Sequence, residues 1–244
     1  GRIVNYSRRN GLSDDFIYAL AQDREGTIWA GTYNGDLYRF RDGAFSILRP
    51  QAGTSQNAIW TIHPDEDGSI WLGTNSGGLI RLKNGRFSSI GTRNGLYNDV
   101  AFQILDDGNG FLWMNCNRGV YRASKKELND FADGRIKRIR SLSFGISEGV
   151  RGVESTGPAQ PAGWKSRDGK LWFPTIKGVV VVDPDYRRRN ERVPPVHIEQ
   201  MTVNDIAVDV TAPPAVGPGR KKIEFTFTAL SFLIPEKNRF KTWL

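Results

Sequence analysis

Residues 65–74 read Asp-Glu-Asp-Gly-Ser-Ile-Trp-Leu-Gly-Thr, and the same phrase lies 42 residues upstream and 42 residues downstream. The upstream copy, at 23–32, is Asp-Arg-Glu-Gly-Thr-Ile-Trp-Ala-Gly-Thr. The downstream copy, at 107–116, is Asp-Gly-Asn-Gly-Phe-Leu-Trp-Met-Asn-Cys. A fourth, more divergent copy at 167–175 reads Arg-Asp-Gly-Lys-Leu-Trp-Phe-Pro-Thr. A fixed period of this length is the signature of a repeat architecture, and it decides the fold class.

Each repeat is predicted to contain four short β-strands. Apolar segments at 17–21 and 59–63 precede the Asp-x-x-Gly turn, in which the Asp side chain bonds local backbone and Gly takes a positive φ. The Trp-containing strand follows, and then a third strand such as 37–40. Asp42-Gly43 and Asn84-Gly85 are hairpin turns, because these dipeptides suit a positive φ at both corners, and strands at 44–48 and 86–90 complete the repeats.

Four antiparallel strands in about 42 residues describe one blade of a β-propeller. An isolated blade cannot cover both of its faces, so neighbouring blades must stack. We therefore predict an all-β fold with four four-stranded blades in a partial ring, and a structural core at Trp29, Trp71, Trp113 and Trp172. The third repeat is followed by an insertion, for which we expect a short helical turn at 125–131 and a strand at 135–140.

The chain is predicted to change domain near residue 190. Residues 1–190 hold the propeller repeats, and residues 191–244 hold a linker and the first strands of an immunoglobulin-like β-sandwich that is cut short. The segment at 223–228 alternates apolar and polar residues, as a sandwich strand does. Because the chain begins without Met and ends after an apolar stretch, we expect it to be a segment of a longer polypeptide.

Several segments resemble one known family in motif and in order. The phrases at 26–32 and 68–74, and the Asn-Gly-Leu lead-ins at 10–12 and 94–96, resemble the two-component regulator propeller repeat. The segment 168–184 resembles the closing blade of that family. The segments 194–204, 222–232 and 240–244 are similar to the start of the Y_Y_Y module, an immunoglobulin-like sandwich that follows these propellers.

This resemblance implies a non-catalytic sensor segment. In the family, propeller and sandwich form the extracytoplasmic part of a membrane protein whose histidine kinase or diguanylate cyclase domain lies outside the segment. The resemblance therefore implies a periplasmic portion of an inner-membrane protein in a bacterial two-component or related signalling system. It also implies a dimer that transmits the signal. Because four repeats are fewer than most propellers hold, we expect either further blades upstream or self-association that completes the ring.

Composition argues against several other classes of protein. The net charge is +8, but no nucleic-acid-binding motif accompanies it, so no nucleic acid is predicted as a partner. The single cysteine, Cys116, excludes a cysteine-rich zinc site, and the two histidines, His63 and His197, lie far apart in the sequence. We find no nucleophile elbow, phosphate loop or paired catalytic carboxylates, so neither a metal, a cofactor nor a catalytic residue is predicted.

Candidate ligand-binding residues follow from the alternation of strands, which gives each blade two different ends. The Asp-x-x-Gly turns and the hairpin turns share one end, here called the tight-turn end. The loops between second and third strands, and those that precede the first strands, share the other, here called the loop end. Function in a repeat scaffold concentrates where loops vary. We therefore expect an unknown small molecule, such as an oligosaccharide or a polyanion, to bind at Tyr33, Asn34, Asn75, Asn117, Arg118, Lys177, Arg151, Glu154, Gln160 and Trp164.

Two other classes of function stay open on the sequence. A propeller lyase of the streptogramin-lyase type has a similar repeat, but it needs a cluster of His and Glu, and this chain has two His. A propeller adaptor that binds a protein partner through one face is the other alternative.

Overall fold

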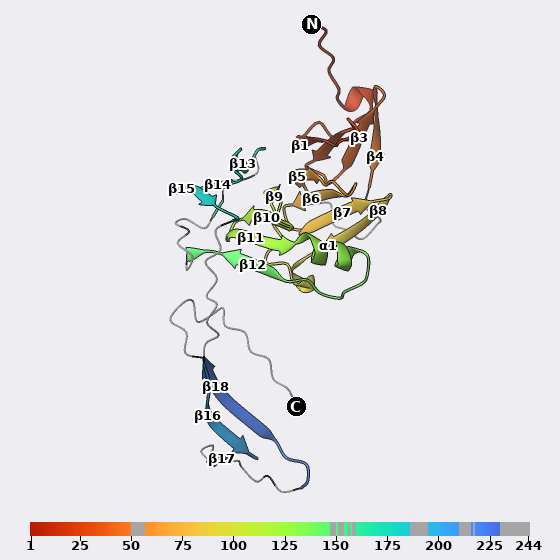
Figure 1. Ribbon diagram of the computed structural model, residues 1–244. Helices are drawn as coiled ribbons and strands as arrows, with labels where there is room; N and C mark the ends of the chain where they lie inside the picture. The colour runs from red at the N-terminus through yellow and green to blue at the C-terminus, as the bar shows by residue number, and fades with distance from the viewer. Residues whose placement is uncertain are drawn as a thin grey trace. The chain divides into compact units, whose positions relative to one another are not determined.

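The computed structural model describes residues 1–49, 57–146, 150, 154–155, 157, 160–185, 195–209, 216 and 218–229. By its contacts the chain divides into two compact units, Gly1–Tyr186 and Arg187–Leu244. The first unit holds four antiparallel sheets that follow one another in chain order (Figure 1). We call these sheets the first to the fourth blade.

The first two blades have the same four-stranded plan. The first contains β1 (Ile17–Gln22), β2 (Ile28–Thr32), β3 (Leu37–Arg41) and β4 (Ala44–Leu48), and the 3-10 turn η1 (Arg8–Asn10) precedes it. The second contains β5 (Ile59–Pro64), β6 (Ile70–Thr74), β7 (Leu79–Lys83) and β8 (Arg86–Ile90). In both, the strands pair in sequence order. The strands predicted for these repeats are confirmed.

The third blade has the same order of strands with a helix inserted. After η2 (Thr92–Asn94) it contains β9 (Gln103–Asp106), β10 (Phe111–Cys116), β11 (Gly119–Ser124) and β12 (Ser141–Phe144). Helix α1 (Lys125–Ala132) lies between β11 and β12, where a helical turn was predicted. At its N-terminus the Ser124 hydroxyl accepts a hydrogen bond from the Glu127 N–H.

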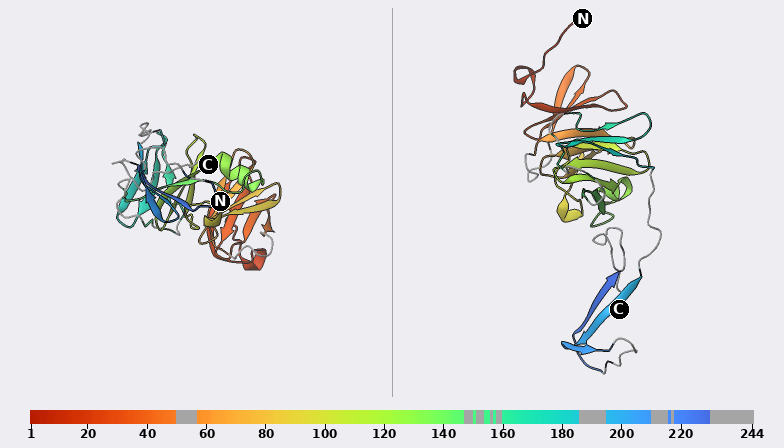
Figure 2. Two further views of the ribbon diagram at one scale, coloured as in Figure 1. Left: turned by 90° about the horizontal axis from the view of Figure 1, so that it is seen from below. Right: turned by 90° about the vertical axis from the view of Figure 1, so that its left-hand side faces the viewer.

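The fourth blade and the second unit contain three strands each within the described residues. The fourth blade comprises β13 (Trp164–Lys165), β14 (Leu171–Thr175) and β15 (Gly178–Val182). The second unit has β16 (Val196–Val203) in the centre, paired antiparallel with β17 (Ile206–Val208) and β18 (Ile223–Ala229). Within the described residues the fold is thus all-β apart from α1 and the two 3-10 turns, and two further views are given in Figure 2.

The predicted turn chemistry is confirmed in the backbone angles. Asp42 and Gly43 have φ of 52° and 81°, and Asn84 and Gly85 have φ of 50° and 74°, which is the positive-φ pair that a two-residue hairpin needs. In the first Asp-x-x-Gly turn, the Asp23 carboxylate accepts hydrogen bonds from two turn N–H groups, those of Glu25 and Thr27.

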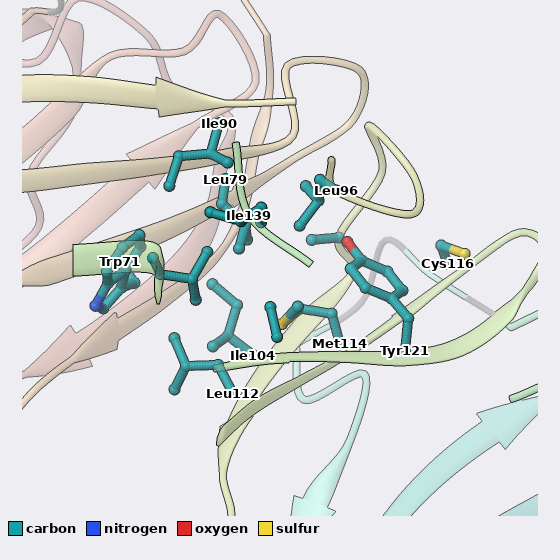
Figure 3. Packing of buried hydrophobic residues seen from close by; sticks show 13 residues of the cluster. Trp71, Leu79, Ile90, Leu96, Ile104, Leu112, Met114, Cys116, Tyr121 and Ile139 are labelled. Atoms are coloured by element: carbon teal, nitrogen blue, oxygen red, sulfur yellow. The ribbon is translucent and has the colours of Figure 1, made fainter. Parts of the chain in front are cut away.

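The core consists of apolar layers between successive blades. Trp29 packs in the layer between the first and second blades, Trp71 between the second and third, and Trp113 between the third and fourth. Figure 3 shows the middle layer, where Trp71 and Leu79 of the second blade lie opposite Leu112 and Met114 of the third. Trp29, Trp71 and Trp113 are 7%, 0% and 2% exposed, so their predicted burial is confirmed.

The prediction that Trp172 is a buried core residue is wrong. Its side chain is 40% exposed, although Leu171 and Phe173 on either side are fully buried against the third blade. Each of the other three tryptophans is covered by the blade that follows it. The described residues contain no sheet after the fourth blade in the first unit, so this face of Trp172 has no such cover.

The strand predicted at 135–140 is also wrong, because this segment is tied to helix α1. The Arg135 guanidinium pairs with Asp130 and Asp133 at the helix C-terminus, and the Arg140 N–H donates to the Glu127 carboxylate. The Ile139 side chain is buried in the layer between the second and third blades. The last strand of the blade therefore begins only at Ser141.

Trp71→Ala and Trp172→Ala provide a matched test of this packing. We expect Trp71→Ala to lower the free energy of unfolding by about 3–5 kcal/mol, because it empties a fully buried site. Trp172→Ala should lower it by less than about 2 kcal/mol, since much of that indole is already in contact with water. Urea unfolding followed by circular dichroism measures both values. Equal losses for the two variants would contradict the blade-to-blade assignment.

Candidate functional site

At the loop end, the predicted residues of the first blade form an exposed aromatic surface. Tyr33 is 55% exposed, and its ring lies 5.8 Å from that of Tyr18, measured between centroids. Asn34 follows in the same turn between β2 and β3 and is also exposed. An exposed tyrosine with a neighbouring amide offers an apolar face and hydrogen-bonding groups together.

The predicted residues of the next two blades are held mainly by local hydrogen bonds. The Asn75 N–H donates to the Ala58 carbonyl (3.2 Å). The Asn117 side chain accepts a hydrogen bond from the Asn98 amide (3.2 Å). Arg118 is exposed, and only its backbone bonds are described, so its guanidinium remains a candidate for anion binding.

Two predicted residues meet at the edge between the third and fourth blades. The Ile176 N–H donates to the Glu154 carbonyl (3.0 Å), which brings the Glu154 backbone beside the loop that carries Lys177. The side chains of Glu154 and Lys177 are both exposed. Arg151, the other candidate in this loop, lies outside the described residues.

Gln160, in contrast, is held in a structural contact, and Trp164, although 65% exposed, lies near the opposite end of its blade. The Gln160 side-chain amide donates to the Leu20 carbonyl and accepts from the Leu20 N–H, both at 2.6 Å, so it pairs with β1 as a neighbouring strand would. Trp164 begins β13 and pairs with Trp172 in register. It stands two residues before Ser166, where the turn to β14 starts, and therefore near the tight-turn end of its blade.

An aromatic position that was not predicted recurs in, or directly before, the first strand of each of the first three blades. Tyr18, Trp60 and Phe102 are spaced by the same 42 residues as the core tryptophans. The rings of Trp60 and Phe102 are stacked, with centroids 4.8 Å apart and planes 16° apart. The sequence signal that identifies them is this spacing, because it equals the period of the tryptophans.

Two clefts lie at the tight-turn end of the first unit. One cleft, of about 310 Å³, lies between turns of the first and second blades, and Asp23, Trp29 and Lys83 are among its lining residues. The other, of about 400 Å³, draws on all four blades, because its lining residues include Arg24, His63, Asp106 and Lys165. We call the first strand of each blade (β1, β5, β9 and β13) its inner strand. The second cleft is here called the axial cleft, because it is lined by residues of these inner strands and of the turns that follow them.

A charged cluster lies beside the axial cleft. The Lys125 ammonium lies 2.8 Å from the Asp65 carboxylate and 2.7 Å from the Asp106 carboxylate. His63 joins them, and one ligand atom from each of His63, Asp65 and Asp106 lies within 4.8 Å of the others. These three residues are therefore the group in the described part of the chain whose side chains could hold a metal ion.

Asp65 does not make the hydrogen bond that the equivalent aspartates make in the first and third blades. The residue six positions before the tryptophan accepts the indole N–H from Trp29 in the first blade (Asp23, 2.8 Å) and from Trp113 in the third (Asp107, 2.9 Å). In the second blade, Trp71 Nε1 and Asp65 Oδ2 are buried, and neither has a hydrogen-bond partner within the described residues. The Asp65 carboxylate bonds Lys125 instead.

Burial and the neighbouring charges act in opposite directions on the pKa values of this cluster. Burial lowers the pKa of His63, and the nearby carboxylates of Asp65 and Asp106 only partly oppose it, so the imidazole is neutral at pH 7. Burial would raise the pKa of Asp106, but hydrogen bonds from Lys125 and the Gly108 N–H hold it below its ordinary value. The two carboxylates in turn raise the pKa of Lys125 against its own burial.

The two-component regulator propeller family model matches residues 11–34 and 53–76 of this chain. These segments fall in the first and second repeats, so the chain carries propeller repeats of that kind in succession. No curated protein sequence matches the chain. No helix within the described residues is both long enough and apolar enough to cross a membrane.

Solved structures share the fold. The extracellular domain of a protein described as a hybrid two-component system from B. thetaiotaomicron is 21% identical, with a TM-score of 0.65 over 86% of this chain and 28% of that one. The extracellular domain of a protein described as a one-component system from the same organism is 19% identical, with a TM-score of 0.53 over 71% of this chain and 24% of that one. This chain thus spans about a quarter of the length of each.

A lyase structure is also similar, at a lower level. Virginiamycin B lyase from Staphylococcus aureus is 16% identical, with a TM-score of 0.48 over 70% of this chain and 56% of that one. A likeness of this size carries no argument about function. The fold of the first unit is thus similar to that of these extracellular domains, and residues 11–34 and 53–76 match the two-component regulator propeller repeat.

Lys125→Met tests the charged cluster. We expect it to lower the free energy of unfolding by about 1–2 kcal/mol at pH 7, because it leaves the largely buried carboxylates of Asp65 and Asp106 without their shared cation. The pKa of Asp106 is lowered in the folded chain. The stability that the ion pair contributes is therefore fully present above the ordinary pKa of Asp, and it is lost as the pH falls through the lower pKa of the folded state. The deficit should therefore shrink below about pH 4 in urea unfolding measured across pH.

Lys126→Met is the matched control, because Lys126 is the next residue and pairs with Asp130 on the exposed side of α1. Its effect should stay below about 0.5 kcal/mol. A deficit for Lys125→Met that is the same at pH 3 and pH 7 would contradict the ionic origin.

Proposed function

We propose that this chain is the ligand-recognition segment of an extracytoplasmic sensor in a bacterial two-component or related signalling protein. The observation that carries the proposal is the match of two successive repeats to the two-component regulator propeller. The similar fold of extracellular domains from proteins described as signalling systems supports it. In this proposal the segment performs no chemistry, and the output activity resides in another part of the parent membrane protein.

Ligand recognition is proposed at the loop end of the blades. Tyr33 and Asn34 in the first blade, Arg118 in the third and Lys177 in the fourth are exposed there. An aromatic face with amide and cationic groups suits the ring faces and hydroxyls of an oligosaccharide, or the charges of a polyanion. The tight turns at the opposite end have fixed backbone requirements, which leaves less freedom to adapt to a ligand.

Signalling in this proposal is a shift between two populations of the sensor. A ligand transmits a signal only if it binds one state more tightly than the other. We propose that the second unit is the beginning of a Y_Y_Y sandwich, and that self-association of the parent protein passes the shift across the inner membrane.

Tyr33→Ala tests the loop-end site. Oligosaccharide mixtures and heparin, a sulfated polyanion, are the probes, and a rise in melting temperature of the full chain is the first readout. For any probe that gives such a rise, Tyr33→Ala should weaken binding about tenfold or more in calorimetric titration, which corresponds to roughly the 1–3 kcal/mol of an aromatic platform.

Phe45→Ala is the control variant, since it removes an aromatic ring from the same blade on β4, within the layer around Tyr38 and outside the loop end. It should lower the melting temperature and leave the affinity of the folded chain unchanged. A ligand whose affinity responds equally to both variants would contradict a loop-end site.

A further inference from the structure

His63, Asp65 and Asp106 present three metal-binding side chains to one another at the tight-turn end. His63 lies near the end of β5, Asp65 in the turn that follows it, and Asp106 at the end of β9. One ligand atom from each lies within 4.8 Å of the other two. Two neighbouring inner strands thus fix the three groups, which is the rigid support that a metal site needs.

Two atoms in this group lack partners. Within the described residues, His63 Nε2 and Asp65 Oδ2 are buried and have no hydrogen bond. The Asp65 side chain is only 1% exposed, so water does not reach it freely. Buried polar atoms are nearly always paired, and an exception calls for a ligand or another physical reason. A metal ion would accept the lone pairs of both atoms at once.

The cluster already attracts a cation. The Lys125 ammonium lies between the two carboxylates, 2.8 Å from Asp65 and 2.7 Å from Asp106. Lys125 is the first residue of α1, and its side chain is 23% exposed, so a flexible stem connects this charge to the surface. A divalent ion in the same place would carry one charge more and would engage His63 as well.

The other blades provide an internal comparison. Asp23 and Asp107 occupy the position of Asp65 and bond the indole N–H of their own blade. Asp65 makes no such bond, and Trp71 Nε1 is left buried without a partner within the described residues. His63 is equally unusual, because Ala21 and Leu105 stand at its position in the first and third repeats. The second blade therefore differs from the first and third in the residue at position 63 and in the bonding of Asp65, and the two residues meet in one cluster.

We propose that His63, Asp65 and Asp106 bind one divalent transition-metal ion, which replaces the Lys125 ammonium between the carboxylates. One imidazole and two carboxylates form a nitrogen–oxygen donor set that suits zinc, and three protein ligands leave a further coordination position. All three residues line the axial cleft, so this position is open to an exchangeable ligand. The site is separate from the loop end and does not depend on sensing there.

Calorimetric titration of the full chain with Zn²⁺, at pH 7 and without a polyhistidine tag, tests the site. We expect one ion per chain. His63→Gln, which keeps the size of the side chain, should weaken binding by about tenfold or more, and Asp106→Asn should do so independently. Lys125→Met should strengthen binding by about tenfold, because it removes the competing cation. A structural ion pair alone does not predict that gain.

His197→Gln is the matched control, since His197 is the other histidine and is exposed in the second unit. Its affinity should equal that of the unaltered chain. Circular dichroism establishes that each variant is folded, and Asp106→Asn decides the matter if His63→Gln does not fold. The proposal is overturned if Zn²⁺ does not bind at submillimolar concentration, if Lys125→Met binds no more tightly, or if His197→Gln removes binding that His63→Gln leaves intact.

A second experiment measures the melting temperature with and without Zn²⁺ instead of the heat of binding. Zn²⁺ should raise the melting temperature of Lys125→Met more than that of the unaltered chain, because the ion supplies the positive charge that the variant lacks. The same addition to the double variant with His63→Gln and Lys125→Met should give a smaller rise. An equal rise in all three proteins would place the zinc elsewhere and overturn the proposal.

Discussion

The structure depends on the packing of one tryptophan from each of the first three blades against the blade that follows. An isolated four-stranded sheet of this length has two faces and cannot bury both, so its stability comes from its neighbours. Trp71 is fully buried between the second and third blades, whereas Trp172, with no following blade in the described residues, is 40% exposed. The same residue in the same strand position is thus core or surface according to what lies beside it.

In the first, third and fourth blades, the turn before the tryptophan also accepts a hydrogen bond from its indole N–H. Asp23 and Asp107 bond both their own turn and an indole N–H, and Ser166 accepts the indole N–H in the fourth blade (2.9 Å). The bond gives the indole N–H a partner. It does not decide burial, because Trp71 is fully buried without it and Trp172 is 40% exposed with it. In the second blade Asp65 does not bond the indole, and its carboxylate instead pairs with Lys125 in a charged cluster.

The repeat also separates two kinds of surface. At the loop end, polar and aromatic side chains such as Tyr33, Arg118 and Lys177 are exposed. At the tight-turn end, positive-φ residues fix the backbone, and the ends of four inner strands or their turns converge on the axial cleft. Recognition of a ligand by variable loops and binding of an ion by a rigid cluster can therefore occur in one unit without competing for the same residues.

The sequence by itself determined the repeat, the strands of each blade, the hairpin turns at Asp42-Gly43 and Asn84-Gly85, and the helical insertion at α1. These features are local, because hydrophobic alternation and turn residues act within a few positions. Tertiary structure alone decided that Trp172 is exposed, that Gln160 pairs with Leu20, and that His63 meets Asp106. Those outcomes depend on which blade lies beside which, and residues distant in sequence come together only when the blades stack.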